Sequence, residues 1–210
     1  MYEVEIKVPA RVAAVRDRLR DAGAERTDAR RQRDVYYDAP HRDFARTDEA
    51  LRVRHETPLS DGIGSPEAAG GTTKLTYKGP LLDAGSKSRE EHETTVDDAD
   101  AAAGIFDGLG FEPAAEVTKR REFWAFEGFT VTLDAVDELG EGGAAGEGGK
   151  PGESRHAGEF VEIEREVDEE AAIPEAREAA GAALDRLGLD ADDQIRTSYL
   201  GLVLAERADE

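Results

Sequence analysis

Hydrophobic and polar side chains alternate with a period of two residues along much of this chain. Such alternation predicts half-buried strands, because successive side chains of a strand point to opposite faces of its sheet. Most connections between these segments are too short for parallel crossovers, which favours antiparallel pairing. We expect eight strands, at residues 2–8, 29–37, 50–56, 73–79, 88–95, 115–126, 129–137 and 159–167.

Helical periodicity fills the gaps between the strands. A proline lies at or just before the start of two helical segments, Pro9 and Pro174, and a glycine follows the end of two, Gly110 and Gly188. Proline at the start and glycine after the end are typical of helices. A mixture of antiparallel strands and separate helices predicts an α+β fold. We expect helices at residues 11–22, 99–109, 174–187 and 193–205.

The length of 210 residues fits one domain with a substantial hydrophobic core. Residues 59–71 and 140–158 lack apolar periodicity, and the second segment is rich in Gly and Glu. Such composition is typical of flexible surface insertions. We therefore expect a single domain over residues 1–210 with two insertions.

Charged residues occupy one whole face of the first strand, where Glu3, Glu5 and Lys7 alternate with Val4 and Ile6. Taken alone, this face is more simply explained as exposed to solvent. However, charges recur at the alternating positions of the other strands. They are Arg52, Arg54, Lys74, Lys78, Lys119 and Arg121, the carboxylates Asp134, Glu162 and Glu164, and the mixed set Arg89, Glu91 and Glu93.

The alternation also indicates which face is inside. If the strands close into a barrel, all the charged faces point either outward or inward, because register fixes the face of every residue. The apolar faces need cover, and amphipathic helices can supply it only from outside the barrel. We therefore expect a closed eight-stranded antiparallel β-barrel with helices packed outside and charges lining its interior.

An interior with this many charges indicates a charged ligand. An unpaired buried ion costs several kcal/mol, so the cations and carboxylates must partly compensate each other. Arg and Lys at several heights suit a polyphosphate. Clustered carboxylates suit Mg²⁺ or Mn²⁺, which prefer oxygen ligands. The chain has no cysteine, and its four histidines show no metal-ligand spacing.

The net charge of -21 restricts the partners and the setting of the protein. The acidic residues are spread along the chain and Lys is scarce, which is typical of proteins from a salt-rich, halophilic cytoplasm. A nucleic acid would meet like charge on the outer surface, so we expect none as a partner. The chain shows no long apolar run and no signal peptide, so we expect a cytoplasmic protein that does not enter membranes. We expect it to be a monomer or a homodimer.

The motif Glu3-x-Glu5-x-Lys7 resembles the signature of the CYTH superfamily, also called triphosphate tunnel metalloenzymes. Its members include class IV adenylate cyclases, thiamine triphosphatases and inorganic triphosphatases. Nearly the whole chain is covered by the resemblance, because seven further segments match in family order. They are residues 32–38, 51–54, 75–80, 88–93, 131–134, 160–164 and 197–200.

The resemblance implies a tunnel that binds a triphosphate together with Mg²⁺ or Mn²⁺. The carboxylates that it assigns to the metal are Glu3, Glu5, Asp134, Glu162 and Glu164. The cations that it assigns to the phosphates are Lys7, Arg52, Arg54, Lys78, Lys119 and Arg121. Asp34 shares the inward face and is expected to tether a neighbouring Arg.

The segments Tyr77-Lys78-Gly79-Pro80 and Ser198-Tyr199-Leu200 are most similar to the class IV adenylate cyclase branch, which implies conversion of ATP to cyclic AMP and pyrophosphate. Gly201 departs from that branch, which commonly has Glu there, as does the insertion at 140–158. The alternatives are a triphosphatase acting on thiamine triphosphate or inorganic tripolyphosphate, and a non-catalytic polyphosphate-binding module. The carboxylate set argues against the last alternative, because anion binding gains nothing from it.

Overall fold

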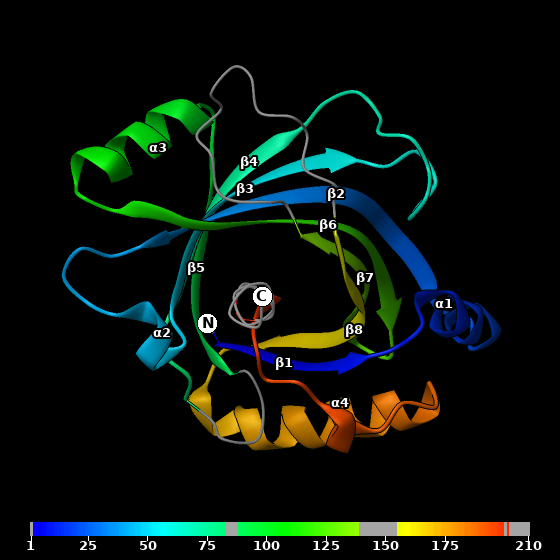
Figure 1. Ribbon diagram of the computed structural model, residues 1–210. Helices are drawn as coiled ribbons and strands as arrows, with labels where there is room; N and C mark the ends of the chain where they lie inside the picture. Colours follow the sequence, from blue (N-terminus) through cyan, green and yellow to red (C-terminus); the bar gives the residue numbers. More distant parts are fainter. Residues whose placement is uncertain (1, 83–87, 139–154, 200, 202–210) are drawn as a thin grey trace.

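Eight antiparallel strands close into a barrel in the computed structural model, which describes residues 2–82, 88–138, 155–199 and 201. Figure 1 looks along the barrel, and its strands follow each other in the order β1-β5-β4-β3-β2-β6-β7-β8. The predicted fold class is confirmed. The strands are β1 (Tyr2–Pro9), β2 (Glu25–Asp38), β3 (Ala50–Pro58), β4 (Thr72–Lys78), β5 (Arg89–Val96), β6 (Glu112–Phe126), β7 (Phe129–Glu138) and β8 (Arg155–Val167).

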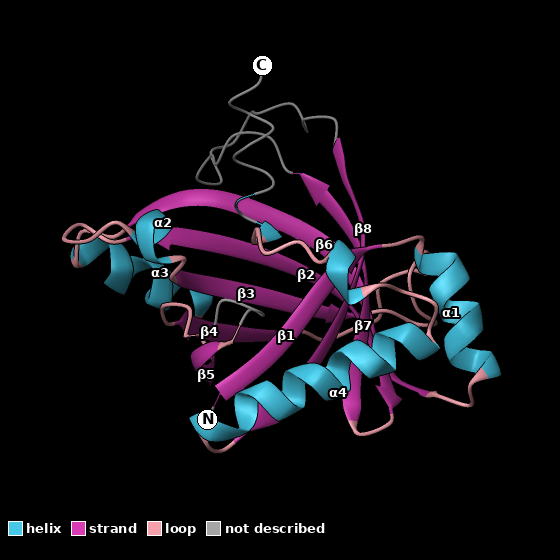
Figure 2. Ribbon diagram, turned by 90° about the horizontal axis from the view of Figure 1, so that it is seen from below, coloured by secondary structure: helices cyan, strands magenta, loops and turns pink. Residues whose placement is uncertain are grey.

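The helices lie outside the barrel, with α4 along β1 and α1 beside β7 and β8 (Figures 1 and 2). Val15 of α1 and Leu184 of α4 share one core with outward-facing residues such as Ile6 and Val131. No helix of the described residues is long and apolar enough to cross a membrane. The helical elements are α1 (Val12–Asp21), α2 (Phe44–Thr47), α3 (Ala99–Gly108), α4 (Ile173–Arg186) and two 3₁₀ turns, η1 (Glu170–Ala172) and η2 (Ala191–Asp193).

Several strands are longer than the alternation indicated. β2 begins at Glu25, where all of the first four side chains are polar and no alternation exists to be seen. This polar part pairs with the end of β6, where Glu25 lies opposite Ala125. The register of the two strands shifts between Arg26 and Asp28. Backbone pairing with a neighbouring strand therefore extends β2 beyond its own hydrophobic pattern.

The helix expected at residues 193–205 is wrong at its start. Residues 194–198 are not helical, and the backbone N–H of Ile195 donates to the carbonyl of Lys7 at 2.8 Å. Pairing with β1 thus prevails over local helical periodicity, and helical geometry is reached only at Tyr199. Residues 202–205 lie outside the described residues. The short helix α2 was not expected, because four residues are too few to show a period.

The two expected insertions differ. Residues 59–71 contact the barrel, because the N–H of Ile63 donates to Glu122 Oε1 at 2.9 Å and the N–H of Leu59 donates to the carbonyl of Ala29 at 2.8 Å. Within the segment, Leu59 forms an isolated β-bridge with Glu67. The flexibility of this segment stays a prediction. Of residues 140–158, the last four belong to β8, since Arg155 pairs with Glu138 of β7, so the second insertion ends earlier than expected. Residues 140–154 lie outside the described residues.

Candidate active site

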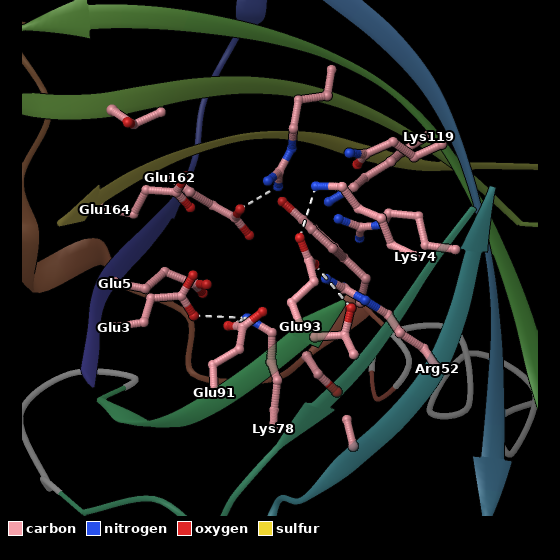
Figure 3. A pocket seen from close by; sticks show the side chains of 18 of the residues that line it. Glu3, Glu5, Arg52, Lys74, Lys78, Glu91, Glu93, Lys119, Glu162 and Glu164 are labelled. Atoms are coloured by element: carbon pink, nitrogen blue, oxygen red, sulfur yellow. Dashed lines mark hydrogen bonds and ion pairs between the residues drawn. The ribbon is translucent and has the colours of Figure 1, made fainter. Parts of the chain in front are cut away.

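The barrel encloses a cavity of about 920 Å³ whose wall is mainly charged (Figure 3). Cationic and acidic side chains from β1, β3, β4, β6 and β8 meet on this wall. The inward orientation of the charged strand faces is therefore as expected. The sequence-predicted residues that line the cavity are Glu3, Glu5, Lys7, Arg52, Arg54, Lys78, Lys119, Arg121, Glu162 and Glu164, whereas Asp134 does not line it.

Three of the predicted carboxylates form a cluster that could hold a metal ion. Glu3, Glu5 and Glu164 each offer an oxygen, and these oxygens lie within 4.8 Å of one another. Burial and the neighbouring carboxylates raise the pKa of Glu3 and Glu5, and they raise the pKa of Glu164 to about 8. The donor set consists of oxygens alone and would gain from a positive charge. It therefore fits a hard divalent cation.

The other two predicted carboxylates contact cations instead. Asp134 is fully buried and accepts hydrogen bonds from Arg121 Nε at 2.6 Å and from the hydroxyl of Tyr199 at 2.7 Å. Glu162 pairs with Arg121 and lies 3.6 Å from Lys7 Nζ. Burial alone would raise the pKa of each carboxyl, but Arg121 and Lys119 outweigh it and lower both. Asp134 and Glu162 thus hold cations of the tunnel in place.

The arginines of β3 differ in how firmly they are held. Arg54 forms a fork with Asp34, through Nε–Oδ1 and Nη2–Oδ2 distances of 2.6 Å each. Arg52 Nη1 lies 3.5 Å from Asp34, and its Nε has no hydrogen-bond partner within the described chain. The expectation that Asp34 tethers a neighbouring Arg is confirmed.

Two lysines face the ring of Tyr199 inside the barrel. Lys7 Nζ lies 4.0 Å and Lys119 Nζ 4.5 Å from its centroid, and Lys7 also donates to the carbonyl of Thr197 at 3.1 Å. Burial, together with the nearby guanidinium of Arg121, lowers the pKa of Lys119 to about 7. A bound phosphate would favour its charged form.

Lys78 connects the cation set to the carboxylate cluster. Its Nζ lies 2.7 Å from Glu3 Oε2 and 2.7 Å from Glu91 Oε2 (Figure 3). Glu91 was seen in the sequence as part of a mixed face with Arg89 and Glu93, but it was not assigned to the site. Tyr199 is not among the site residues that the sequence predicts, because packing with a hydrogen-bonded hydroxyl is the commoner role of a tyrosine. The structure places it on the cavity wall.

A comparison with protein families matches the CYTH domain to residues 1–199. The chain belongs to the CYTH family. CYTH domains bind triphosphate substrates and are generally metal-dependent, which agrees with the combination of cations and clustered carboxylates in this tunnel. The family membership predicted from the sequence motifs is thus confirmed.

Two named relatives and a solved structure resemble most of the chain. A Methanocaldococcus jannaschii protein named "Putative adenylate cyclase MJ0240" is 32% identical over 203 residues, which is 96% of this chain and 98% of the relative. "Adenylate cyclase CyaB" of Aeromonas hydrophila is 24% identical over 168 residues, or 80% and 70% of the two chains. The structure of the PH1819 protein from Pyrococcus horikoshii OT3 has a TM-score of 0.78 at 35% identity and covers 98% of this chain and 99% of its own.

Proposed function

We propose that this CYTH protein is a class IV adenylate cyclase that converts ATP to cyclic AMP and pyrophosphate with Mg²⁺ or Mn²⁺. One observation carries the proposal: the carboxylate cluster and the cations lie side by side in the tunnel. Lys78 contacts Glu3 of the cluster and lines the same cavity as Arg52. A triphosphate and a metal ion could therefore share the tunnel. The name of the Methanocaldococcus relative supports a cyclase.

The metal would be held by Glu3, Glu5 and Glu164, and when bound it would neutralise charge on phosphate oxygens. Arg54 and Arg121 are fixed by carboxylate forks and so would present their remaining guanidinium edges in constant directions. Positioning and charge stabilisation are the main contributions that proteins make to transfer at phosphorus.

In the proposed reaction the ribose 3′-oxygen forms a bond to the α-phosphorus. The bond from that phosphorus to the oxygen bridging to the β-phosphate breaks, pyrophosphate leaves with the electron pair, and the hydroxyl proton passes to water. Lys7, Lys119 and Arg121 would stabilise the charge that develops on the leaving pyrophosphate.

A triphosphatase is the second candidate, and the composition of the wall favours it. Apart from the rings of Tyr36 and Tyr199, the apolar side chains among the described residues that line the cavity are Ala50 and Phe123. The guanidinium groups of Arg30 and Arg121 lie 5.5 and 5.8 Å from the centroid of Phe123. The ring of Phe123 thus lies near two cations, which could hold a terminal phosphate there in place of a nucleobase. In this alternative, water would attack the terminal phosphorus of thiamine triphosphate or tripolyphosphate.

Product analysis distinguishes these functions. The purified protein is incubated with ATP, thiamine triphosphate or tripolyphosphate, each with Mg²⁺ or Mn²⁺, and the products are separated by chromatography. Cyclic AMP and pyrophosphate from ATP are the expected result. ADP and orthophosphate without a cyclic nucleotide would replace the cyclase by a triphosphatase. Binding without turnover of any of the three would leave a polyphosphate-binding module.

A further inference from the structure

Gln32 carries a buried hydrogen-bond acceptor that the described residues leave without a partner. Its side chain lies on the cavity wall and is 1% exposed, and its Oε1 has no hydrogen bond within the described part of the chain. Leaving such a group unpaired costs free energy, so buried polar atoms of this kind usually have a partner. A ligand in the tunnel is the available partner.

The orientation of this amide is fixed by its other end. Gln32 Nε2 donates to Glu56 Oε1 at 2.7 Å, and Glu56 also pairs with Arg30 and lies 3.8 Å from Lys74. Rotating the amide by half a turn would bring two acceptor oxygens to hydrogen-bond distance, which is repulsive. The unpartnered atom is therefore the oxygen.

This acceptor requires a donor from the ligand. An ionised phosphate offers only acceptor oxygens and cannot satisfy Gln32 Oε1. A metal ion is disfavoured by the two cations beside it, since Lys119 is opposite Gln32 on β6 and Arg30 is two residues away on the same face of β2. An O–H or N–H group remains.

We propose that Gln32 binds the organic part of the substrate by accepting a hydrogen bond from an O–H or N–H group. The substrate is then a triphosphate ester of a donor-bearing group, such as a nucleoside, rather than inorganic tripolyphosphate. The inference rests on the proposed function, in that it requires the tunnel to bind triphosphates.

Titration calorimetry tests the inference. The divalent metal is omitted so that the substrate is not turned over. ATP and tripolyphosphate are each titrated into the wild type and the Gln32→Leu variant at the same ionic strength. We expect the variant to bind ATP about tenfold more weakly, the effect of one lost hydrogen bond, and tripolyphosphate within about twofold of the wild type. The titration is repeated with 2′,3′-dideoxy-ATP. If the wild type and the variant then bind equally, the donor is a hydroxyl of the sugar; if the variant still binds more weakly, the donor is on the base.

Controls separate this role from a structural one. Gln194→Leu changes the other glutamine of the chain, which does not line the cavity, and should bind both ligands like the wild type. Gln32→Met keeps the length of the side chain and replaces Gln32→Leu if thermal melting shows that the latter is unfolded. Equal weakening of both ligands, or of neither, would overturn the inference. Failure of the wild type to bind either triphosphate even when Mg²⁺ is added would instead overturn the proposed function.

Discussion

Glu5 on β1 and Glu164 on β8 lie opposite each other as an antiparallel pair, and both line the tunnel. Like charges at such positions destabilise a sheet. Burial is the main cause of the raised pKa of both carboxyls, and Glu3 and Glu162 add repulsion at each. In the metal-free protein, proton uptake therefore relieves this repulsion up to about pH 8, and a bound cation would replace the proton.

Glu5→Gln and Glu164→Gln each test the proposed metal cluster. Both substitutions remove a charge at nearly constant volume, so we expect folding to be kept and turnover to fall by more than about 100-fold. Glu166→Gln, on the same face of β8 but outside the cluster, is the matched control and should keep most of the activity. Rates like those of the wild type in both cluster variants would refute the site.

The same cluster predicts a stability change in the metal-free protein. Because the pKa of Glu164 in the folded state, about 8, exceeds its ordinary value of 4.5, ionisation of Glu164 costs stability as the pH rises through this range. Glu164→Gln removes that cost. At pH 8 with a chelator, we expect the variant to melt at least about 3 °C above the wild type, the shift for roughly 1 kcal/mol in a domain of this size. At pH 4 the two melting temperatures should be equal. A difference in melting temperature that does not change with pH would contradict the raised pKa of Glu164.

Arg121 and Arg52 should differ in their importance for stability. Arg121→Leu leaves Asp134 and Glu162 buried without their main partner, which typically costs about 3–5 kcal/mol. Arg52→Leu leaves Asp34 paired with Arg54, so the loss should be clearly smaller. Urea unfolding of the two variants measures the difference. Equal losses would show that the carboxylate forks do not determine stability here.

Lys119 predicts a pH dependence of phosphate binding. Its lowered pKa of about 7, caused by burial and then by Arg121, means that the unliganded side chain loses its charge as the pH rises through neutrality. Lys119→Arg stays charged throughout. Relative to this variant, the affinity of the wild type for tripolyphosphate should fall by about tenfold between pH 6 and pH 8. The affinities of both proteins are measured by calorimetry at each pH, and their ratio cancels the ligand's own ionisation. A ratio that does not change with pH would contradict the prediction.

Salt should stabilise the folded protein. A net charge of -21 on 210 residues implies repulsion over the surface, which counterions screen. We expect the melting temperature in 2 M KCl to exceed that in dilute buffer by at least about 3 °C. Equal melting temperatures in the two solutions would refute the adaptation to a salt-rich cytoplasm.

The alternation of residues was sufficient to predict the strands and the charged interior. Val4 and Ile6 require an apolar environment, amphipathic helices can provide it only from outside, and the charges between them must then face inward. The chain beyond α4 could not be predicted in this way. Ile195 donates to the carbonyl of Lys7, and Tyr199 enters the barrel, through contacts with residues nearly two hundred positions away.

Which carboxylates cluster together and which pair with cations depended on the tertiary structure. Glu162 and Glu164 have the same residue type, the same strand and the same face, so a period of two cannot distinguish them. Strand register sets Glu164 opposite Glu5 and Glu162 opposite Lys7. One glutamate therefore joins a like-charged cluster with a raised pKa, and the other pairs with cations that lower its pKa. Sequence period fixes the face of a side chain, whereas the neighbours at the same height of a barrel are fixed only when the strands pair and the barrel closes.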